Sequence, residues 1–214
     1  MSYLNIGLYV VISDNGKDIL SGKNKYLYGI KDIKLVEFGV EYSINNLSFL
    51  QVNHEIKTYM YNRVLDNIGP YDNIVDAYSG AGLLSAIMAK KCNYVIGIEI
   101  NKSANESAIN LCKNNNITNV NFVCGDVGVN LSTYLHNANV VVLDPPRAGC
   151  DDKVINELLS ANSLLKIIYI SCDTATLSRD LAKLNQHFMI CEIVPMDMFP
   201  QTKHVETFVC LQKR

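Results

Sequence analysis

Carboxylates follow three successive apolar runs in the middle of this 214-residue chain, and a glycine-rich segment lies beside the first of them. Residues 76–82 read DAYSGAG, and glycines there let the backbone turn tightly and approach a ligand. Glu99 ends the next run, where a carboxylate accepts hydrogen bonds from ribose hydroxyls, and Asp126 follows the third run, where it can face an adenine. These residues predict a nucleoside cofactor, and Ser85 in place of a third glycine favours S-adenosylmethionine over NAD.

A carboxylate and a thiol follow the next two apolar runs. Residues 144–149 read DPPRAG, and the double proline stiffens the loop and fixes the direction of Asp144, which suits hydrogen bonding to a planar base. Cys172 ends the other run, before a stretch that predicts a helix, and we expect the helix dipole to favour a thiolate while the charge of Asp173 opposes it. We interpret the six other cysteines as small buried hydrophobic residues.

A further polar segment, residues 197–206, reads DMFPQTKHVE and lies between the last two apolar runs. It brings a carboxylate, Glu206, and a histidine, His204, to the same edge of the predicted sheet. Taken alone, this segment is explained equally well as an ordinary polar hairpin loop.

The elements that must position these residues alternate from about residue 74 onward, which is typical of a parallel sheet with crossover helices. We expect strands over residues 73–77, 94–100, 120–124, 140–143 and 166–171, and helices over residues 52–68, 83–92, 103–115, 152–161 and 176–186, the last capped by Thr176. Residues 188–194 and 204–211 predict an antiparallel pair that closes the sheet edge. The fold class is therefore α/β, with a doubly wound sheet of seven strands.

The first fifty residues have a different pattern, with short strands over residues 6–12, 25–29 and 36–44, turn residues between them and no helix. They are too few to bury a core of their own. We therefore divide the chain into a small β-rich part, residues 1–50, and an α/β domain, residues 51–214.

Composition excludes several classes of protein. With 49% hydrophobic and 19% charged residues the chain is typical of globular proteins, and neither a membrane-length apolar run nor a signal peptide is present, so we expect the cytoplasm. Seven cysteines without a C-x-x-C pair argue against a disulfide scaffold and against a zinc or other metal site. A net charge of -2 argues against holding nucleic acid by bulk electrostatics and leaves a local basic patch open.

Together these segments resemble the RNA uracil-5-methyltransferase family, whose members use S-adenosylmethionine to make 5-methyluridine in transfer and ribosomal RNA. The family pattern consists of F-x-Q-x-N, a glycine loop, D-P-P-R-x-G, S-C-N-P-x-T-x-x-R-D and D-M-F-P-x-T-x-H-x-E. Its counterparts here are residues 49–53, 76–82, 144–149, 171–180 and 197–206. The resemblance covers the chain from about residue 25 to its end and implies a Rossmann-like class I methyltransferase fold, with an antiparallel last strand, over residues 51–214.

The resemblance also implies roles for individual residues. Cys172 is the expected nucleophile, which adds to C6 of uracil, and Glu206 is the expected base, which removes the C5 proton. Asp144 lies at the boundary of cofactor and uracil, and Arg147 and Arg179 are structural or face phosphates. The remaining expected contacts to S-adenosylmethionine are Gln51, Tyr78, Gly80, Gly82, Glu99 and Asp126. The expected partner is an RNA uridine, in rRNA or tRNA, and neither DNA nor a membrane.

The sequence departs from the family at two places. Asp173-Thr174 replaces the Asn-Pro that follows the cysteine. The N-terminal OB-like RNA-binding domain of family members, which in some holds an iron-sulfur cluster, has no counterpart, so we expect no such cluster and interpret residues 1–50 as the remnant of a β-rich central subdomain.

Two other functions remain open. An amino-methyltransferase also uses a D/N-P-P motif but needs an aromatic residue where Arg147 stands, and it needs no cysteine. The chain is alternatively a module that binds S-adenosylmethionine or RNA, or an incomplete catalytic fragment, without turnover on its own.

Overall fold

The computed structural model describes residues 7–12, 23–44 and 53–214. The chain divides into two compact units, Met1–Leu50 and Gln51–Arg214. In the first unit β1 (Gly7–Ile12) pairs with β2 (Lys23–Gly29), and β3 (Ile33–Glu37) pairs with β4 (Val40–Ile44), both antiparallel. The interpretation of this unit as the remnant of a larger subdomain stays a prediction.

The expectation of a single strand over residues 36–44 is wrong. The chain reverses at Phe38 and Gly39, whose φ angles are +49° and +71°, so that Glu37 pairs with Val40. Two successive residues with positive φ match the right-handed twist of the flanking strands and make a tight hairpin.

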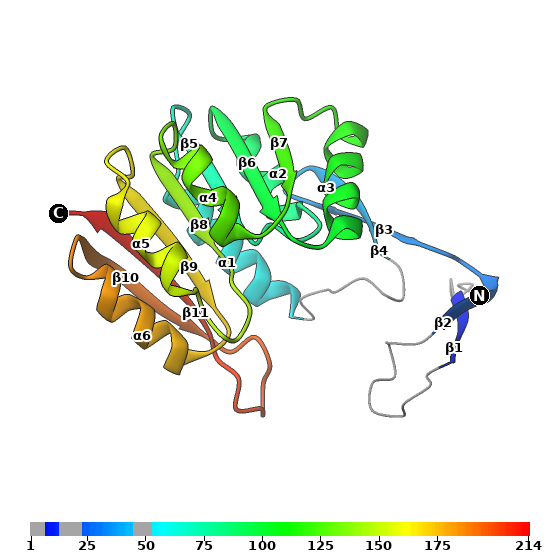
Figure 1. Cartoon of the computed structure of the whole chain (residues 1–214). Coiled ribbons are helices and arrows are strands. Elements are labelled where there is room, and N and C mark those ends of the chain that lie inside the picture. Colours follow the sequence, from blue (N-terminus) through cyan, green and yellow to red (C-terminus); the bar gives the residue numbers. More distant parts are fainter. Residues whose placement is uncertain (1–6, 13–22, 45–52) are drawn as a thin grey trace. The chain divides into compact units, whose positions relative to one another are not determined.

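The second unit is built on one sheet of seven strands in the order β10-β11-β9-β8-β5-β6-β7 (Figure 1). Five of its strands run parallel to one another: β5 (Asn73–Ala77), β6 (Tyr94–Glu99), β7 (Val120–Cys124), β8 (Val140–Leu143) and β9 (Lys166–Ser171). The chain then forms the edge strand β10 (Phe188–Met196) and returns as β11 (Glu206–Lys213), which is antiparallel to both of its neighbours. The predicted α/β sheet with an antiparallel last strand is confirmed.

Helices cover both faces of this sheet (Figure 1). One core cluster joins the strands to α4 (Val127–Leu135), α5 (Asp152–Ser160) and α6 (Thr174–Leu184), and the other joins them to α1 (His54–Asp66) and the end of α2 (Leu83–Ala89). Helix α3 (Lys102–Asn114) contacts β7, β6 and α2. Sequence reasoning missed α4, although Val127, Leu131 and Leu135 recur at helical spacing and are all buried.

Side-chain caps set the start of four helices. Asn53, Asn101 and Asp151 each accept a backbone N–H bond from the third residue that follows, at the starts of α1, α3 and α5. Asp173 caps α6, so the expectation that Thr176 caps this helix is wrong. Within the described ranges, no helix has the length and apolar character that crossing a bilayer requires.

Candidate active site

The predicted site residues gather at the carboxyl edge of the sheet. Tyr78, Asp126, Asp144 and Cys172 lie at or just beyond the ends of β5, β7, β8 and β9, and Glu99 ends β6. Glu206 begins β11, and because that strand runs the opposite way, its start lies at the same edge. Strand order reverses between β8 and β5, so the edge contains the crevice in which open α/β sheets bind ligands. Gln51 lies outside the described residues.

Four of the polar side chains at this edge project from the same face of the sheet. Side chains alternate between faces along a strand, so residues two positions apart share a face. Asp76, Asp144, Cys172 and Glu206 each lie two positions from a residue of the core cluster on the α1 face, namely Ile74, Val142, Ile170 and Phe208. The structure thus brings the expected nucleophile, base and base-edge acceptor together on adjacent strands.

Cys172 and Glu206 are opposite each other across two hydrogen-bonded strands. The last pair between β9 and β11 is Ser171 with Thr207, and the same register continued by one residue places Cys172 opposite Glu206. Directly opposed residues of an antiparallel pair have Cβ atoms about 4.5–5.5 Å apart. Cys172 and Glu206 are therefore neighbours, although 34 positions separate them in the sequence.

The pKa values of three carboxyl groups at this edge, those of Glu206, Asp76 and Asp144, are raised. Burial raises the pKa of Glu206, which is 4% exposed, and the charge of Arg147 partly offsets that shift. Burial also raises the pKa of Asp76 to about 7, opposed by the hydroxyl of Ser85, which donates to its carboxylate, and reinforced by the charge of Glu99.

Asp144 is open to solvent, yet lost hydration, followed by the charges of Glu206 and Asp76, raises its pKa to about 7. The direction of this shift holds at an exposed position as well, because two nearby carboxylates by themselves oppose ionisation. A ligand can therefore reach a carboxyl group that keeps its proton more readily than an ordinary aspartate.

The thiol of Cys172 is only partly buried, and its pKa is raised. Burial is the main cause, the charges of Glu206 and Asp144 add to it, and Arg147 lowers the pKa. The net shift in the pKa of Cys172 is therefore away from the thiolate, and the contribution expected from the following helix stays a prediction.

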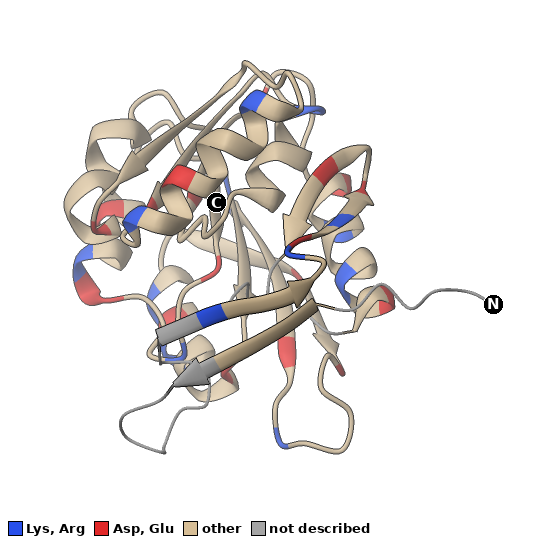
Figure 2. Cartoon of the chain, turned by 90° about the vertical axis from the view of Figure 1, so that its right-hand side faces the viewer, with Lys and Arg blue, Asp and Glu red and all other residues tan. Residues whose placement is uncertain are grey.

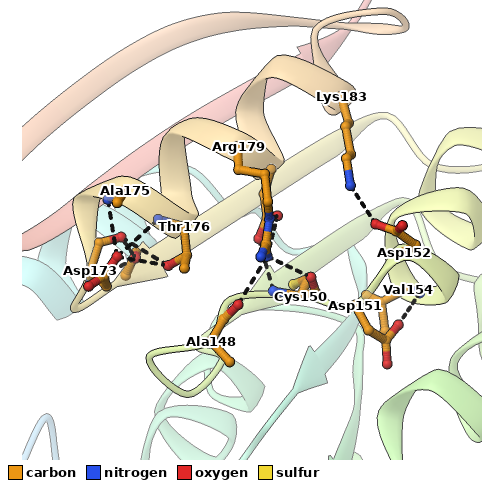
Figure 3. Close-up of polar contacts among 12 residues, drawn as sticks. Ala148, Cys150, Asp151, Asp152, Val154, Asp173, Ala175, Thr176, Arg179 and Lys183 are labelled. Atoms are coloured by element: carbon orange, nitrogen blue, oxygen red, sulfur yellow. Dashed lines mark hydrogen bonds and ion pairs between the residues drawn. The ribbon is translucent and has the colours of Figure 1, made fainter.

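The side chain of Asp173 caps the N-terminus of helix α6 (Figure 3). Its Oδ1 accepts from the backbone N–H of Ala175 at 3.1 Å and of Thr176 at 2.9 Å. These bonds and the Thr176 hydroxyl hold the pKa of Asp173 below its usual value. Asparagine caps helices about as well as aspartate, so the difference from the family pattern at this position is compatible with the same cap.

Arg147 is the cation that acts on this cluster. Its charge lowers the pKa of Cys172, of Glu206 and of Asp173, and its Nη2 lies 3.3 Å from Nε2 of His204. Elsewhere in the described part of the chain, Lys and Arg are interspersed with Asp and Glu (Figure 2). Attraction of an anionic ligand to this edge therefore depends on single cations rather than on a broad basic face.

The glycine loop leaves open space beside Gly80. Its φ is +55°, and a Cβ added there would meet nothing within 4 Å. Gly82, with φ +80°, is instead packed against α3, because a Cβ there would lie 2.5 Å from the Cβ of Ala108. Glu99 holds the loop, with Oε2 accepting from the N–H of Gly80 at 2.9 Å, and the nearby Ser79 Oγ is buried without a partner.

Tyr78 and Asp126 flank this loop. Tyr78 adopts φ +68°, a conformation that costs a non-glycine residue about 1 kcal/mol or more and that often marks a functional site. Its half-buried phenol packs against the core, and burial, followed by the charge of Cys150, raises its pKa. Asp126 precedes α4, makes no side-chain cap bond and is exposed, so its carboxylate is accessible to a ligand.

The expectation that all six other cysteines are buried needs correction. Cys124 and Cys191 are exposed, whereas Cys92, Cys112, Cys150 and Cys210 are buried as expected. Asp76 opens the segment of residues 76–82, but the sequence analysis gives it no role at the site, although a charge inside an apolar strand directly before a glycine loop is a usable signal. In the portions of the chain that the structure describes, no group of three or more His, Cys, Asp or Glu side chains could hold a metal ion.

A family model described as tRNA (Uracil-5-)-methyltransferase matches residues 11–127 and 125–214, nearly the whole chain. The chain belongs to this family. The resemblance seen in the sequence motifs is thereby confirmed.

Relatives and solved structures agree with this assignment. An uncharacterized RNA methyltransferase of Leptospira interrogans is 38% identical over 90% of this chain and 49% of its own length, and one of Clostridium tetani is 35% identical over 98% and 46%. The crystal structure of Pyrococcus abyssi tRNA (uracil-54, C5)-methyltransferase with S-adenosyl-L-homocysteine is 28% identical, with a TM-score of 0.81 over 96% of this chain and 50% of that one. The chain spans about half the length of the curated relatives it matches.

Proposed function

We propose that this chain carries the catalytic centre of an S-adenosylmethionine-dependent RNA methyltransferase that methylates C5 of a uridine in tRNA or rRNA. The observation that carries the proposal is the pairing of Cys172 with Glu206 across β9 and β11, beside Asp144 on the same face of the sheet. Family membership and the likeness to the Pyrococcus abyssi enzyme support it.

The residues of the glycine loop fit the cofactor. The open space at Gly80 admits a ligand close to the backbone, and the buried, unpartnered Oγ of Ser79 offers a hydrogen bond. Glu99 and Asp126 stand at the ends of β6 and β7, where carboxylates can accept bonds from a ribose and face an adenine. S-adenosylmethionine bound there supplies an electrophilic methyl group.

Cys172 makes C5 of uracil reactive. C5 is a poor nucleophile, and addition of the Cys172 sulfur to C6 converts the ring into an enolate whose electron density lies on C5 and O4. The thiol must lose its proton for this addition, and the raised pKa of Asp144 makes its carboxylate a better acceptor of that proton than an ordinary one. Glu206 stays ionised for the later step.

Asp144 and Glu206 act at two different stages of the reaction. A protonated Asp144 donates a hydrogen bond to O4 as negative charge develops there, which its pKa of about 7 permits near neutral pH. Once C5 carries the methyl group, the carboxylate of Glu206 removes the C5 proton and the C6–S bond breaks. This restores the uracil ring and releases the thiolate, which takes its proton back from Asp144, while Glu206 gives the C5 proton to solvent.

Mass analysis under denaturing conditions, after incubation with S-adenosylmethionine and RNA containing 5-fluorouridine, tests the proposal. Fluorine replaces the proton that Glu206 must remove, so we expect a methylated protein-RNA adduct at Cys172. Cys172→Ala should form no adduct and should keep its affinity for S-adenosylmethionine. Glu206→Gln should accumulate the same methylated adduct with ordinary uridine RNA.

A chain that binds S-adenosylmethionine but forms no adduct would contradict the proposal and support a binding module or an incomplete catalytic fragment. An adduct that persists in Cys172→Ala would remove this cysteine from the mechanism.

A further inference from the structure

The loop that carries Asp144 and Arg147 into the site is held by side chains of helix α6 (Figure 3). Thr176 Oγ1 donates to the carbonyl of Arg147 at 3.1 Å. One turn further along, Nη2 of Arg179 donates to the carbonyls of Ala148 at 3.0 Å and Cys150 at 2.9 Å. Three of the four backbone carbonyls from Arg147 to Cys150 are thus bonded to side chains of one helix face, the exception being Gly149.

Asp180 holds the same loop from inside the protein. Its side chain is 0% exposed, and Oδ2 accepts from the backbone N–H of Cys150 at 2.9 Å and from the hydroxyl of Tyr169 at 2.7 Å. Oδ1 pairs with Arg179 at 2.8 Å. A buried carboxylate is stable only when its oxygens are satisfied in this way, so the loop amide is part of what keeps Asp180 in place.

Gly149 shows how closely the loop approaches this pair. Its φ is +73°, and a Cβ there would lie 2.7 Å both from Nη2 of Arg179 and from Oδ2 of Asp180. Only glycine combines the backbone conformation with the absence of a side chain that this contact requires.

The helix that provides these contacts begins directly after the proposed nucleophile. Cys172 precedes the cap residue Asp173, and Arg179 lies less than two turns into α6. One rigid element therefore fixes both Cys172 and the loop that carries Asp144.

We propose that Arg179 and Asp180 are positioning residues for the reaction, which hold Asp144 at the distance from Cys172 that the uracil ring requires without touching the substrate. This inference rests on the proposed function. A displacement of about 1 Å in a positioned group can cost roughly 10²-fold in rate.

Lys183 provides a matched control on the same helix. It lies four residues after Arg179 and pairs with Asp152 at the start of α5, so its removal also breaks one ion pair between α6 and the segment after β8. The two basic side chains are similarly exposed, 45% for Arg179 and 37% for Lys183. Of these two basic side chains, Arg179 donates to carbonyls of the loop and Lys183 pairs with Asp152 instead.

The experiment compares Arg179→Ala, Arg179→Lys and Lys183→Ala in the full chain. Three quantities are measured: the rate of adduct formation with 5-fluorouridine RNA at saturating concentrations, the Kd for S-adenosylmethionine, and hydrogen exchange at the backbone amide of Cys150. For Arg179→Ala we expect a rate about 10²-fold lower, a Kd within about threefold of the parent and faster exchange. Arg179→Lys should recover only part of the rate, because an ammonium keeps the charge but not the planar fork.

Lys183→Ala should match the parent in all three quantities. An unchanged rate in Arg179→Ala, or an equal loss in Lys183→Ala, would overturn the inference, as would a full recovery in Arg179→Lys. If the parent chain forms no adduct, the proposed function fails, and hydrogen exchange still decides whether Arg179 holds the loop. In that case, an unchanged rate of hydrogen exchange at the Cys150 amide in Arg179→Ala would overturn the inference that Arg179 holds the loop.

Discussion

Alanine at Gly80 and at Gly82 should separate two roles of the glycine loop. A methyl group at Gly82 would lie 2.5 Å from the Cβ of Ala108 and 2.9 Å from Cζ of Phe122, in a backbone with φ +80°. A methyl group at Gly80 would meet nothing within 4 Å, in a backbone with φ +55°. Gly82 is therefore constrained by packing as well as by its backbone conformation, and Gly80 by its backbone conformation alone.

The expected losses of stability follow from these contacts. A left-handed conformation costs a residue with a Cβ roughly 1–2 kcal/mol, and overpacking adds roughly 1–3 kcal/mol at Gly82. Alanine returns about 0.4–1 kcal/mol by restricting the unfolded chain. The free energy of unfolding should therefore fall by roughly 1–4 kcal/mol in Gly82→Ala and by at most about 1.5 kcal/mol in Gly80→Ala.

Urea denaturation and calorimetric titration with S-adenosylmethionine measure the two effects. Gly80→Ala should remain folded and bind at least about tenfold more weakly, equivalent to about 1.4 kcal/mol, because the methyl group fills space that the ligand uses. A Gly80→Ala variant that binds like the parent would show that the open space is not part of the cofactor site. Equal destabilisation of the two variants would refute the packing argument.

Two further predictions concern proton equilibria. The rate of alkylation of Cys172 by iodoacetamide should rise with pH through a pKa above the ordinary thiol value, and Glu206→Gln should move the profile to lower pH by removing a charge that opposes the thiolate. Asp173→Asn should shift the alkylation profile less, since the Asp173 carboxylate is engaged in the helix cap. A larger shift in Asp173→Asn than in Glu206→Gln would contradict the attribution of the raised thiol pKa to Glu206. Asp76 binds its proton more tightly in the folded chain, with a pKa of about 7, than in the unfolded chain, so its contribution to stability is complete below about pH 4 and is lost as pH rises to about 7. Denaturation at several pH values should therefore show that the free energy of unfolding declines less between about pH 4 and pH 7 in Asp76→Asn than in the parent. The same decline in both proteins would exclude Asp76 as its source.

The sequence was sufficient to predict the sheet and the edge at which the site lies. Strand periodicity located β5 to β11, and the motifs from residue 76 onward fall at strand ends because chemistry in open α/β sheets concentrates there. Motif order then assigned Cys172, Glu206 and Asp144 to one place before any distance was known.

The remaining features depend on contacts that no local pattern encodes. The hairpin of β3 and β4 turns at Phe38 and Gly39, a pair without the usual Asn-Gly signal, so a continuous strand was the natural expectation. The raised pKa of Cys172 arises first from burial and then from the charges of Glu206 and Asp144, which lie at the ends of other strands.

The ladder between β9 and β11 fixes the relative positions of Cys172 and Glu206 more firmly than a loop could. Because Cys172 and Glu206 extend the register of Ser171 with Thr207, an insertion of one residue within either strand would turn one of the two side chains to the opposite face of the sheet. Changes in the exposed segment from Gln201 to Lys203, which lies before β11, leave that register intact. The spacing of Cys172 and Glu206 is thereby separated from this exposed segment, and under the proposed function a different RNA target would not require a different arrangement of the two side chains.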